Sequence, residues 1–314
     1  MASFLFALNA TMPVFLVMVL GYFLRRIDML NQAFCDVGDK FVFQVALPVL
    51  LFCDIMEMDL AADFDWTFVL FCAIATTVMF FGVWGAARLF LKDKSLVGAF
   101  SQAAARSSAA ILGVAFVENM YGNSGMVPMM IVAAVPLFNI YSVIILTFSA
   151  AGEQGREGAV KRACINVCKN PIIIGILLGL IASLIQLELP AILDKTLSNV
   201  SALATPLALL IVGANFQGKK ALAKVKPTAW ATAIKLVILP AVFLPIAIAL
   251  GIRESALVAV LIMTGSPTTV SCYIMAKNMG NDEVLTASIV VSATLLSSVT
   301  LTFWIFLLQF LGFI

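Results

Sequence analysis

The sequence contains no histidine and few charged side chains. Histidine is absent from the 314 residues, and Asp, Glu, Lys and Arg together make up only 11% of them. The composition of a soluble domain includes about a quarter charged residues, so that class of protein is excluded. Without histidine, Cys164 and Cys168 cannot form a typical zinc site. We therefore interpret the six cysteines as small hydrophobic residues and expect no metal site.

Motifs of common enzymes are also missing. The chain has no P-loop, no HExxH and no GxSxG sequence, the patterns of nucleotide hydrolysis, zinc proteases and serine hydrolases. An ATP-driven pump within this chain is excluded, and we expect neither an enzyme nor a resident cofactor. The net charge of +2 gives no reason to expect nucleic acid as a partner.

Long apolar runs dominate the sequence. Hydrophobic residues make up 62% of the chain, and the mean hydropathy is +1.09. Since a membrane-spanning helix needs about 20 apolar residues, the runs predict an all-α polytopic membrane protein with ten spans. The predicted spans are 3–24, 33–56, 66–91, 95–119, 125–150, 170–189, 192–215, 227–251, 254–278 and 283–312.

The basic residues are distributed unevenly between the loops. Fifteen of the nineteen lie in odd-numbered loops, whereas the even-numbered loops hold only Lys195 and Arg253, together with most of the acidic residues. The positive-inside rule therefore predicts that the odd loops are cytoplasmic and that both termini lie outside. The remaining two, Arg106 and Lys235, lie within predicted spans.

The two halves of the chain have proline and serine residues at matching positions. Pro13 recurs as Pro171 and Pro48 as Pro206, each 158 residues later, and Ser107 recurs as Ser266 after 159 residues. These matches predict five-span repeats over 1–150 and 170–314, joined by a cytoplasmic linker, 151–169, that is amphipathic or flexible. Because five is odd, the second repeat enters the membrane inverted. Inverted repeats are typical of secondary transporters that bind substrate at broken helices near the midplane.

The fourth and ninth spans contain the predicted breaks. Pro267 removes a backbone donor next to Gly265, whereas the segment around Arg106 has only small polar neighbours. A charge within a span indicates a functional site by default. If both helices break, the new helix N-termini and Arg106 together favour an anionic ligand, a carboxylate above all.

Other polar residues within the spans have two interpretations each. Asn139 either hydrogen-bonds a substrate oxygen or makes a bond between helices. For Lys235 we favour a side chain that reaches the inner interface over one that contacts ligand. Gln44, Gln102 and Tyr273 are possible supports of the site. Prolines within spans predict kinks, and a further set of residues predicts close helix packing: Gly175, Gly179 and Gly213.

Several segments, in order, resemble the auxin efflux carrier family: FVFQVALPVLLF, FSQAAARSSAAILGVAF, NPIIIGILLGL, IKLVILP and SPTTVSCYIMAKNMGND. That family includes the plant PIN-type carriers and bacterial malate and malonate permeases. The resemblance implies ten helices in the fold shared with bile-acid sodium symporters, with helices 4 and 9 broken and crossing. It also implies a scaffold of helices 1, 2, 6 and 7, a mobile part of helices 3–5 and 8–10, an elevator mechanism and a homodimer.

The resemblance also assigns a binding site position by position. It implies substrate contacts by Arg106, Ser107, Ser108, Asn139, Ser266, Pro267 and Thr268. Plant carriers have Asn-Pro where this chain has Ser107 and Ser108, and the long cytoplasmic loop of many of them is absent. The short bacterial members of the cytoplasmic membrane are therefore closer, and a small mono- or dicarboxylate such as malate or malonate is the expected substrate. A channel, or a carrier of an auxin-like aromatic carboxylate, is the alternative. Sodium-coupled, proton-coupled and uncoupled transport all stay open.

Overall fold

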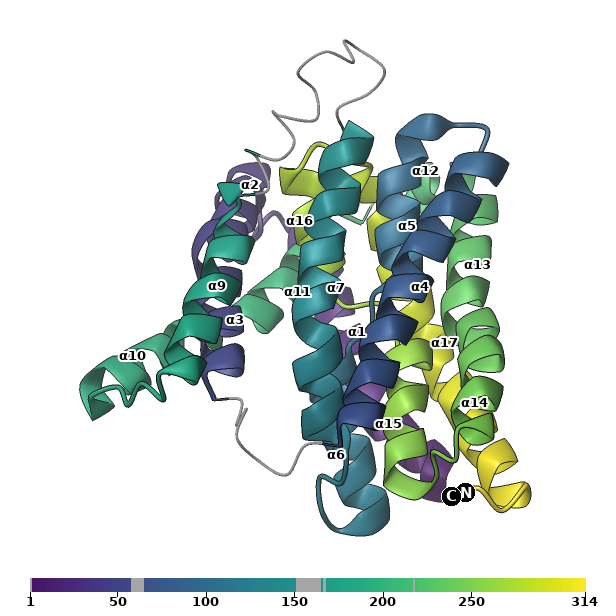
Figure 1. Cartoon of the computed structure of the whole chain (residues 1–314). Helices are drawn as coiled ribbons and strands as arrows, with labels where there is room; N and C mark the ends of the chain where they lie inside the picture. The colour runs from purple at the N-terminus through teal and green to yellow at the C-terminus, as the bar shows by residue number, and fades with distance from the viewer. Residues whose placement is uncertain (1, 58–64, 151–164, 166–167, 217) are drawn as a thin grey trace.

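Helices make up most of the residues that the computed structural model of the protein describes, which are 2–57, 65–150, 165, 168–216 and 218–314 (Figure 1). No strand occurs in these ranges. A helical segment lies in each of the ten ranges that the sequence predicts. The predicted linker 151–169 falls outside the described residues, apart from Ile165, Cys168 and Lys169.

The helices have the following bounds. They are α1 (Ala2–Arg26), α2 (Gln32–Phe41), η1 (Val42–Ala46), α3 (Leu47–Met56), α4 (Trp66–Phe90), η2 (Lys94–Leu96), α5 (Val97–Ala105), α6 (Ala109–Tyr121), α7 (Val127–Ala150), α9 (Pro171–Leu184), α10 (Ala191–Ser201), α11 (Ala204–Ala214), α12 (Gly218–Ala223), α13 (Val225–Ala233), η3 (Ile234–Ile238), α14 (Leu239–Ala249), α15 (Glu254–Gly265), α16 (Ser271–Asn278) and α17 (Glu283–Phe310). Among the described residues, five helical runs are long and apolar enough to cross a membrane: 66–90, 127–150, 191–214, 225–249 and 283–310. Such runs are those of a multi-pass membrane protein.

Two of the predicted proline kinks take the form of π-helical turns. The π-helices η1 and η3 end two residues before Pro48 and Pro240. Pro240 has no N–H to donate to the carbonyl of Leu236, four residues earlier. The indole N–H of Trp304 donates to that carbonyl instead, at 3.0 Å. The wider turn thus keeps the helical run continuous while a neighbouring helix satisfies the freed carbonyl.

Glycines allow two pairs of helices to approach closely. Helix α1 packs against α11, and α3 packs against α9. A Cβ atom added to Gly175 on α9 would lie 2.5 Å from the carbonyl oxygen of Pro48 on α3, and one added to Gly179 would lie 3.0 Å from that of Phe52. On α11, a Cβ atom at Gly213 would collide with the backbone of Met18. The predicted close-packing role of the three glycines is confirmed.

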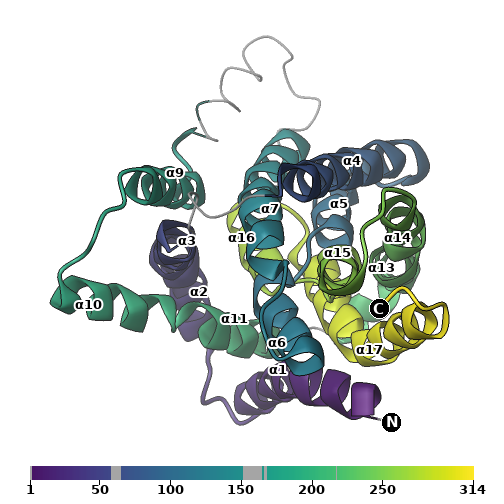
Figure 2. The same cartoon turned by 60° about the horizontal axis from the view of Figure 1, so that its bottom comes forward.

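The buried apolar side chains form two cores. One joins α4, α5, α6, α14 and α15, and the other joins α1, α2, α3, α9, α11 and α16. Helices α7 and α17 contribute side chains to both. Viewed from the end, α3, α9 and α11 lie on one side of the molecule and α4, α5, α13 and α14 on the other, with α7 between them (Figure 2).

The α3–α9 contact predicts a strong effect of one methyl group. Gly175→Ala should lower the melting temperature of the purified protein, because the added Cβ meets backbone atoms of Pro48 and overpacking costs about 1–3 kcal/mol. Gly82→Ala on α4 is the matched control, since its Cβ would meet nothing within 4 Å. Equal melting temperatures of the two variants would contradict the packing described here.

Candidate functional site

Two helical runs are interrupted at equivalent places. Helix α5 ends at Ala105, and α6 begins only after the non-helical residues 106–108. In the second half, α15 ends at Gly265, and α16 begins at Ser271. Both breaks were predicted from the sequence, although the first contains neither proline nor glycine.

The two breaks lie against each other. The backbone N–H of Ser108 donates to the carbonyl of Pro267 at 2.9 Å. The hydroxyl of Thr268 donates to the carbonyl of Ala103 at 2.7 Å, and the hydroxyl of Ser107 donates to the carbonyl of Met263. A buried backbone group must be hydrogen-bonded somewhere, and here each break supplies partners that the other needs. This mutual bonding explains how the first break forms without a helix-breaking residue.

Helix ends of both polarities meet at this crossing. The N-termini of α6 and α16 start there, and the C-termini of α5 and α15 end there. Helix N-termini carry partial positive charge and C-termini partial negative charge. The crossing therefore has one region suited to an anion and another suited to a cation.

A cavity of ≈ 460 Å³ adjoins the N-terminal region of the crossing. Its lining includes residues from both helix starts, from α7 and from the length of α3. The lining residues are Leu47, Leu50, Leu51, Asp54, Glu57, Arg106, Ser107, Ser108, Ala109, Ile131, Val135, Phe138, Asn139, Thr205, Thr269 and Ser271. Arg106, Ser107, Ser108 and Asn139 of the predicted site are thus brought to one cavity.

Arg106 is the cation of this cavity. Its side chain is 6% exposed. The guanidinium donates to Oδ1 of Asn139 at 2.6 Å, to Oγ of Ser142 at 3.4 Å and to the sulfur of Met275 at 3.1 Å. Among the described residues, no carboxylate lies within ion-pair distance of it. Within the described residues, the hydrogen-bond partners of this buried positive charge are all neutral.

Asn139 makes the interhelical bond that was one of its two predicted roles. Its oxygen accepts from Arg106, while its amide donates to the carbonyl of Val135 at 2.9 Å. Ser142 was missed by the sequence reading. It lies three residues after Asn139, and residues at that spacing share a helix face, so this spacing was the available signal.

The other predicted residues occupy different surroundings. Pro267 and Thr268 line a smaller cavity of ≈ 80 Å³ next to Ser108. Ser266 is buried, and its hydroxyl has no hydrogen-bond partner in the structure. Of the supports, Gln102 is buried and its amide approaches the carbonyl of Cys272 at 3.5 Å. Two of the predicted supports do not line the larger cavity. Tyr273 is buried elsewhere, and Gln44 is exposed on η1.

The favoured interpretation of Lys235 is wrong. Its side chain does not reach an interface but is 0% exposed. The ammonium donates to the carbonyl of Thr264 at 2.8 Å, to that of Ala105 at 3.4 Å and to the hydroxyl of Ser107. The crossing brings together carbonyls from two helix ends, and these carbonyls hold the side chain inside the protein. The residues next to Lys235 in the sequence give no sign of these distant partners.

Two acidic residues also belong to the cavity. Asp54 and Glu57, on the last turn of α3 and at its C-terminal end, line it together with Arg106. From the sequence, both residues are expected only near the end of the predicted span 33–56. Their presence means that the cavity holds carboxylates as well as a cation, without an ion pair to Arg106 in the described structure.

Comparison with known proteins identifies the family. The model of the membrane transport protein family matches residues 6–305, and the chain belongs to this family, that of the auxin efflux carriers. The predicted resemblance is therefore confirmed.

The chain is 24% identical to the uncharacterized transporter YfdV of Escherichia coli strain K12, over 96% of this chain and 97% of the relative. It is 23% identical to an uncharacterized transporter of Methanothermobacter thermautotrophicus, over 96% and 98%. It is 24% identical to a putative malonate transporter of Rhizobium meliloti, over 95% and 94%. The protein is a membrane transporter of this family.

Proposed function

We propose that this membrane transporter is a secondary carrier of a small organic anion, a mono- or dicarboxylate such as malate or malonate. One observation carries the proposal: Arg106 is buried at the cavity with only neutral partners. A buried charge is costly unless it is paired. A substrate carboxylate supplies the missing partner and can accept two parallel hydrogen bonds from a guanidinium.

The helix ends support the same ligand. Ser108 and Ala109 at the start of α6, and Thr269 and Ser271 around the start of α16, line the cavity beside Arg106. Broken helices in transporters direct such N-termini at anionic substrate groups. Hydroxyl groups of Ser108, Thr269 and Ser271 are the proposed donors to the remaining substrate oxygens.

The cavity also limits the charge of the substrate. A volume of ≈ 460 Å³ lies within the usual range of ligand sites, about 300–1,000 Å³. Asp54 and Glu57 share the cavity, and like charges in one site repel. One carboxylate of the substrate therefore binds Arg106, and a second is oriented toward the hydroxyls and away from α3. The name of the Rhizobium meliloti relative, a putative malonate transporter, supports a dicarboxylate.

Helix pairing supports ten spans in two inverted repeats. The pairs α1 with α11 and α3 with α9 are the reciprocal pairs that a two-fold relation between repeats produces. The runs 66–90 and 225–249 are each 25 residues long, and both ends are 159 residues apart. The helix breaks recur at nearly the same offset. We assign 1–150 and 170–314 to the two repeats on these grounds.

The position of the cavity supports an elevator mechanism. Helices α1, α2, α3, α9 and α11 form the proposed scaffold, which corresponds to spans 1, 2, 6 and 7, and their core also includes side chains of α7, α16 and α17 from the proposed mobile part. The cavity lies between this group and the other helices, because α3 and Thr205 face Arg106 and α7 across it. Movement of the second group past the first would carry Arg106 and its substrate across the membrane. The homodimer stays a prediction from the family resemblance.

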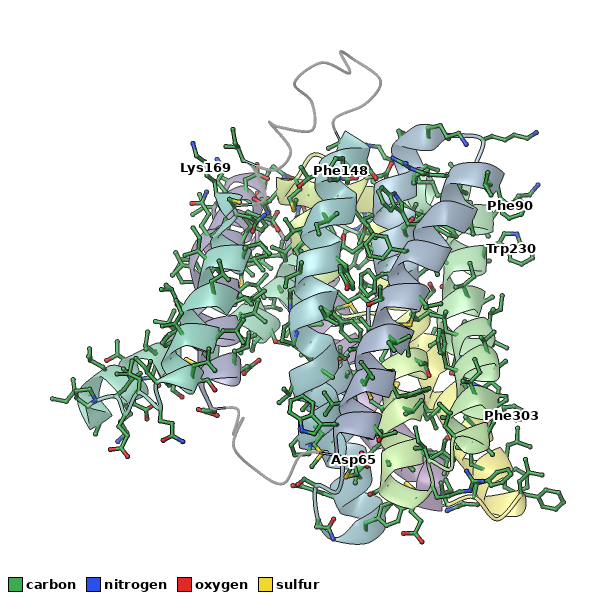
Figure 3. The ribbon with its side chains drawn as sticks, viewed as in Figure 1. Asp65, Phe90, Phe148, Lys169, Trp230 and Phe303 are labelled. Atoms are coloured by element: carbon green, nitrogen blue, oxygen red, sulfur yellow. The ribbon has the colours of Figure 1, made fainter. Side chains whose placement is uncertain are left out.

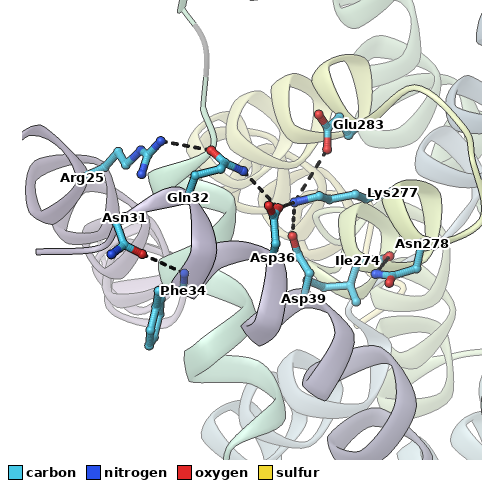
Figure 4. A network of polar contacts seen from close by, with 10 residues as sticks. All are labelled: Arg25, Asn31, Gln32, Phe34, Asp36, Asp39, Ile274, Lys277, Asn278 and Glu283. Atoms are coloured by element: carbon cyan, nitrogen blue, oxygen red, sulfur yellow. Dashed lines mark hydrogen bonds and ion pairs between the residues drawn. The ribbon is translucent and has the colours of Figure 1, made fainter. Parts of the chain in front are cut away.

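Charged side chains connect α2 and α16 at one end of the molecule. Lys277 on α16 contacts Asp39 and Asp36 on α2, the latter at 3.3 Å, and Glu283 at 3.9 Å (Figure 4). Lys169 lies at this end, whereas Asp65 and both termini lie at the opposite end (Figures 1 and 3). The cavity follows α3 toward Glu57, away from the charged contact. Taking the predicted orientation, with both termini outside, we propose that this is an outward-facing state whose cytoplasmic side is closed by the charged contact.

Two substitutions test the anion site in opposite ways. Arg106→Ala removes the cation, and Asn139→Asp places a carboxylate beside it to act as a built-in competitor for the substrate. Both should abolish thermal stabilisation by carboxylates, measured with malate, malonate, succinate, lactate, pyruvate and indole-3-acetate, and should abolish counterflow of any carboxylate that binds the wild type. The aspartate variant should itself melt higher than the alanine variant, because it retains a paired charge.

Arg88→Ala is the control for loss of one positive charge, since Arg88 lies over the ring of Trp84 outside the cavity. It should bind and exchange carboxylates as the wild type does. Persistent carboxylate transport by Arg106→Ala would refute the site. A current without saturation would identify a channel.

A second prediction concerns the closed end. Asp39→Asn should loosen the contact of α2 with α16, because it removes the carboxylate nearest Lys277. Cys35, one turn earlier on α2, is buried and should react with N-ethylmaleimide severalfold faster in this variant, as measured by peptide mass spectrometry.

Asp93→Asn is the matched control at the same end. Hydrogen bonds from Ser95 hold the pKa of Asp93 below its usual value, so this substitution also removes a charge, but from a carboxylate that accepts its hydrogen bonds within its own loop. Unchanged labelling of Cys35 in Asp39→Asn would exclude the charged contact as a closure.

A further inference from the structure

Lys235 is a buried cation without an acidic partner. It lies in the π-helix η3, its side chain is 0% exposed, and within the described parts of the chain no carboxylate pairs with it. Arg106 shares that property, but Arg106 lines the cavity and Lys235 does not. A second unpaired charge within about one side chain of the first needs its own explanation, because burial of a charge is costly.

The atoms around its ammonium provide that explanation. They are the carbonyl oxygens of Ala105, the last residue of α5, and of Thr264, one residue before the end of α15, together with the hydroxyl oxygen of Ser107. All three are oxygen acceptors, and two come from helix ends that carry partial negative charge. Half-helix C-termini of this kind bind sodium ions or protons in other transporters with broken helices.

We infer that the crossing forms a monovalent-cation site at the C-termini of α5 and α15, and that the ammonium of Lys235 permanently occupies it as a tethered cation. The crossing then needs no free sodium ion to neutralise its two C-termini. The cation site depends only on the contacts of Lys235, whereas its consequence, anion transport that is independent of sodium, rests on the proposed function.

Ser107 connects the two charged regions. Its hydroxyl accepts from Lys235 and donates to the carbonyl of Met263, while its backbone separates Arg106 from Ser108. The residue that follows Arg106 is thereby fixed by the tethered cation. Removal of the ammonium leaves the three oxygens with an empty space in which a small monovalent cation fits.

The test compares melting temperatures of the full chain in choline chloride, sodium chloride and methylammonium chloride at one ionic strength. The wild type should melt at the same temperature in all three. Lys235→Ala should melt about 5 °C or more lower in choline chloride, because charge-assisted hydrogen bonds are lost. Sodium or methylammonium should restore its melting temperature saturably.

Two variants serve as controls. Lys235→Met has a side chain of similar length that fills the space without a charge, so it should melt low and not respond to cations. Lys226→Ala loses an exposed lysine of the same helical run and should behave as the wild type. If Lys235→Ala yields no folded protein in choline medium, recovery in methylammonium medium supports the site and failure in both media overturns it.

Saturable stabilisation of the wild type by sodium, or a folded Lys235→Ala that no cation stabilises, would overturn the inference. Carboxylate binding, measured on the same samples, separates the two proposals. A cation response of Lys235→Ala without any carboxylate binding by the wild type refutes only the proposed function. Carboxylate binding by a wild type that sodium also stabilises refutes only the tethered cation.

Discussion

The crossing of two interrupted helices, each of which satisfies backbone groups that the other leaves free, is the constraint on which the structure depends. Two backbone or hydroxyl donors, at Ser108 and Thr268, reach carbonyls on the opposite segment. In a bilayer, irregular backbone is tolerated only where protein or a polar cavity surrounds it. The surrounding helices meet that condition: the π turn η3, which precedes Pro240, places Lys235 against the crossing, and α7 places Asn139 and Ser142 against Arg106.

This arrangement separates charge along the crossing. Two helix C-termini face an ammonium that belongs to the chain itself, and two helix N-termini face a cavity next to a guanidinium that lacks an acidic partner. One polarity is thus satisfied internally, and the other is the one to which we assign the proposed anionic ligand. The cavity is lined by residues of both cores, so the proposed ligand site lies where the proposed elevator movement takes place.

The sequence predicted the helical ranges and the helix breaks, because these features depend on residues that are close together in the chain. Apolar length gave ten ranges, each of which contains a helical segment, Pro267 with Gly265 indicated one break, and Arg106 indicated the other. The sequence did not predict the features that depend on contacts between segments far apart in the chain. Lys235 resembles any lysine within a predicted span, and only the approach of helix ends 29 and 130 residues away explains its burial. Similarly, Asp54 and Glu57 carry no local sign that α3 faces the cavity. Pro48 and Pro240 indicated distortions of their helices, but the sequence did not show that these distortions would be π-helical turns.

The most direct test of this account is a structure with a bound brominated carboxylate, located by the anomalous scattering of bromine. The account predicts a single strong peak in the cavity lined by Arg106, Phe138 and Ser271, with the carboxylate hydrogen-bonded to the guanidinium, and no peak in the Arg106→Ala protein. A carboxylate bound elsewhere, with the bond between Arg106 and Asn139 undisturbed and the cavity empty, would contradict it.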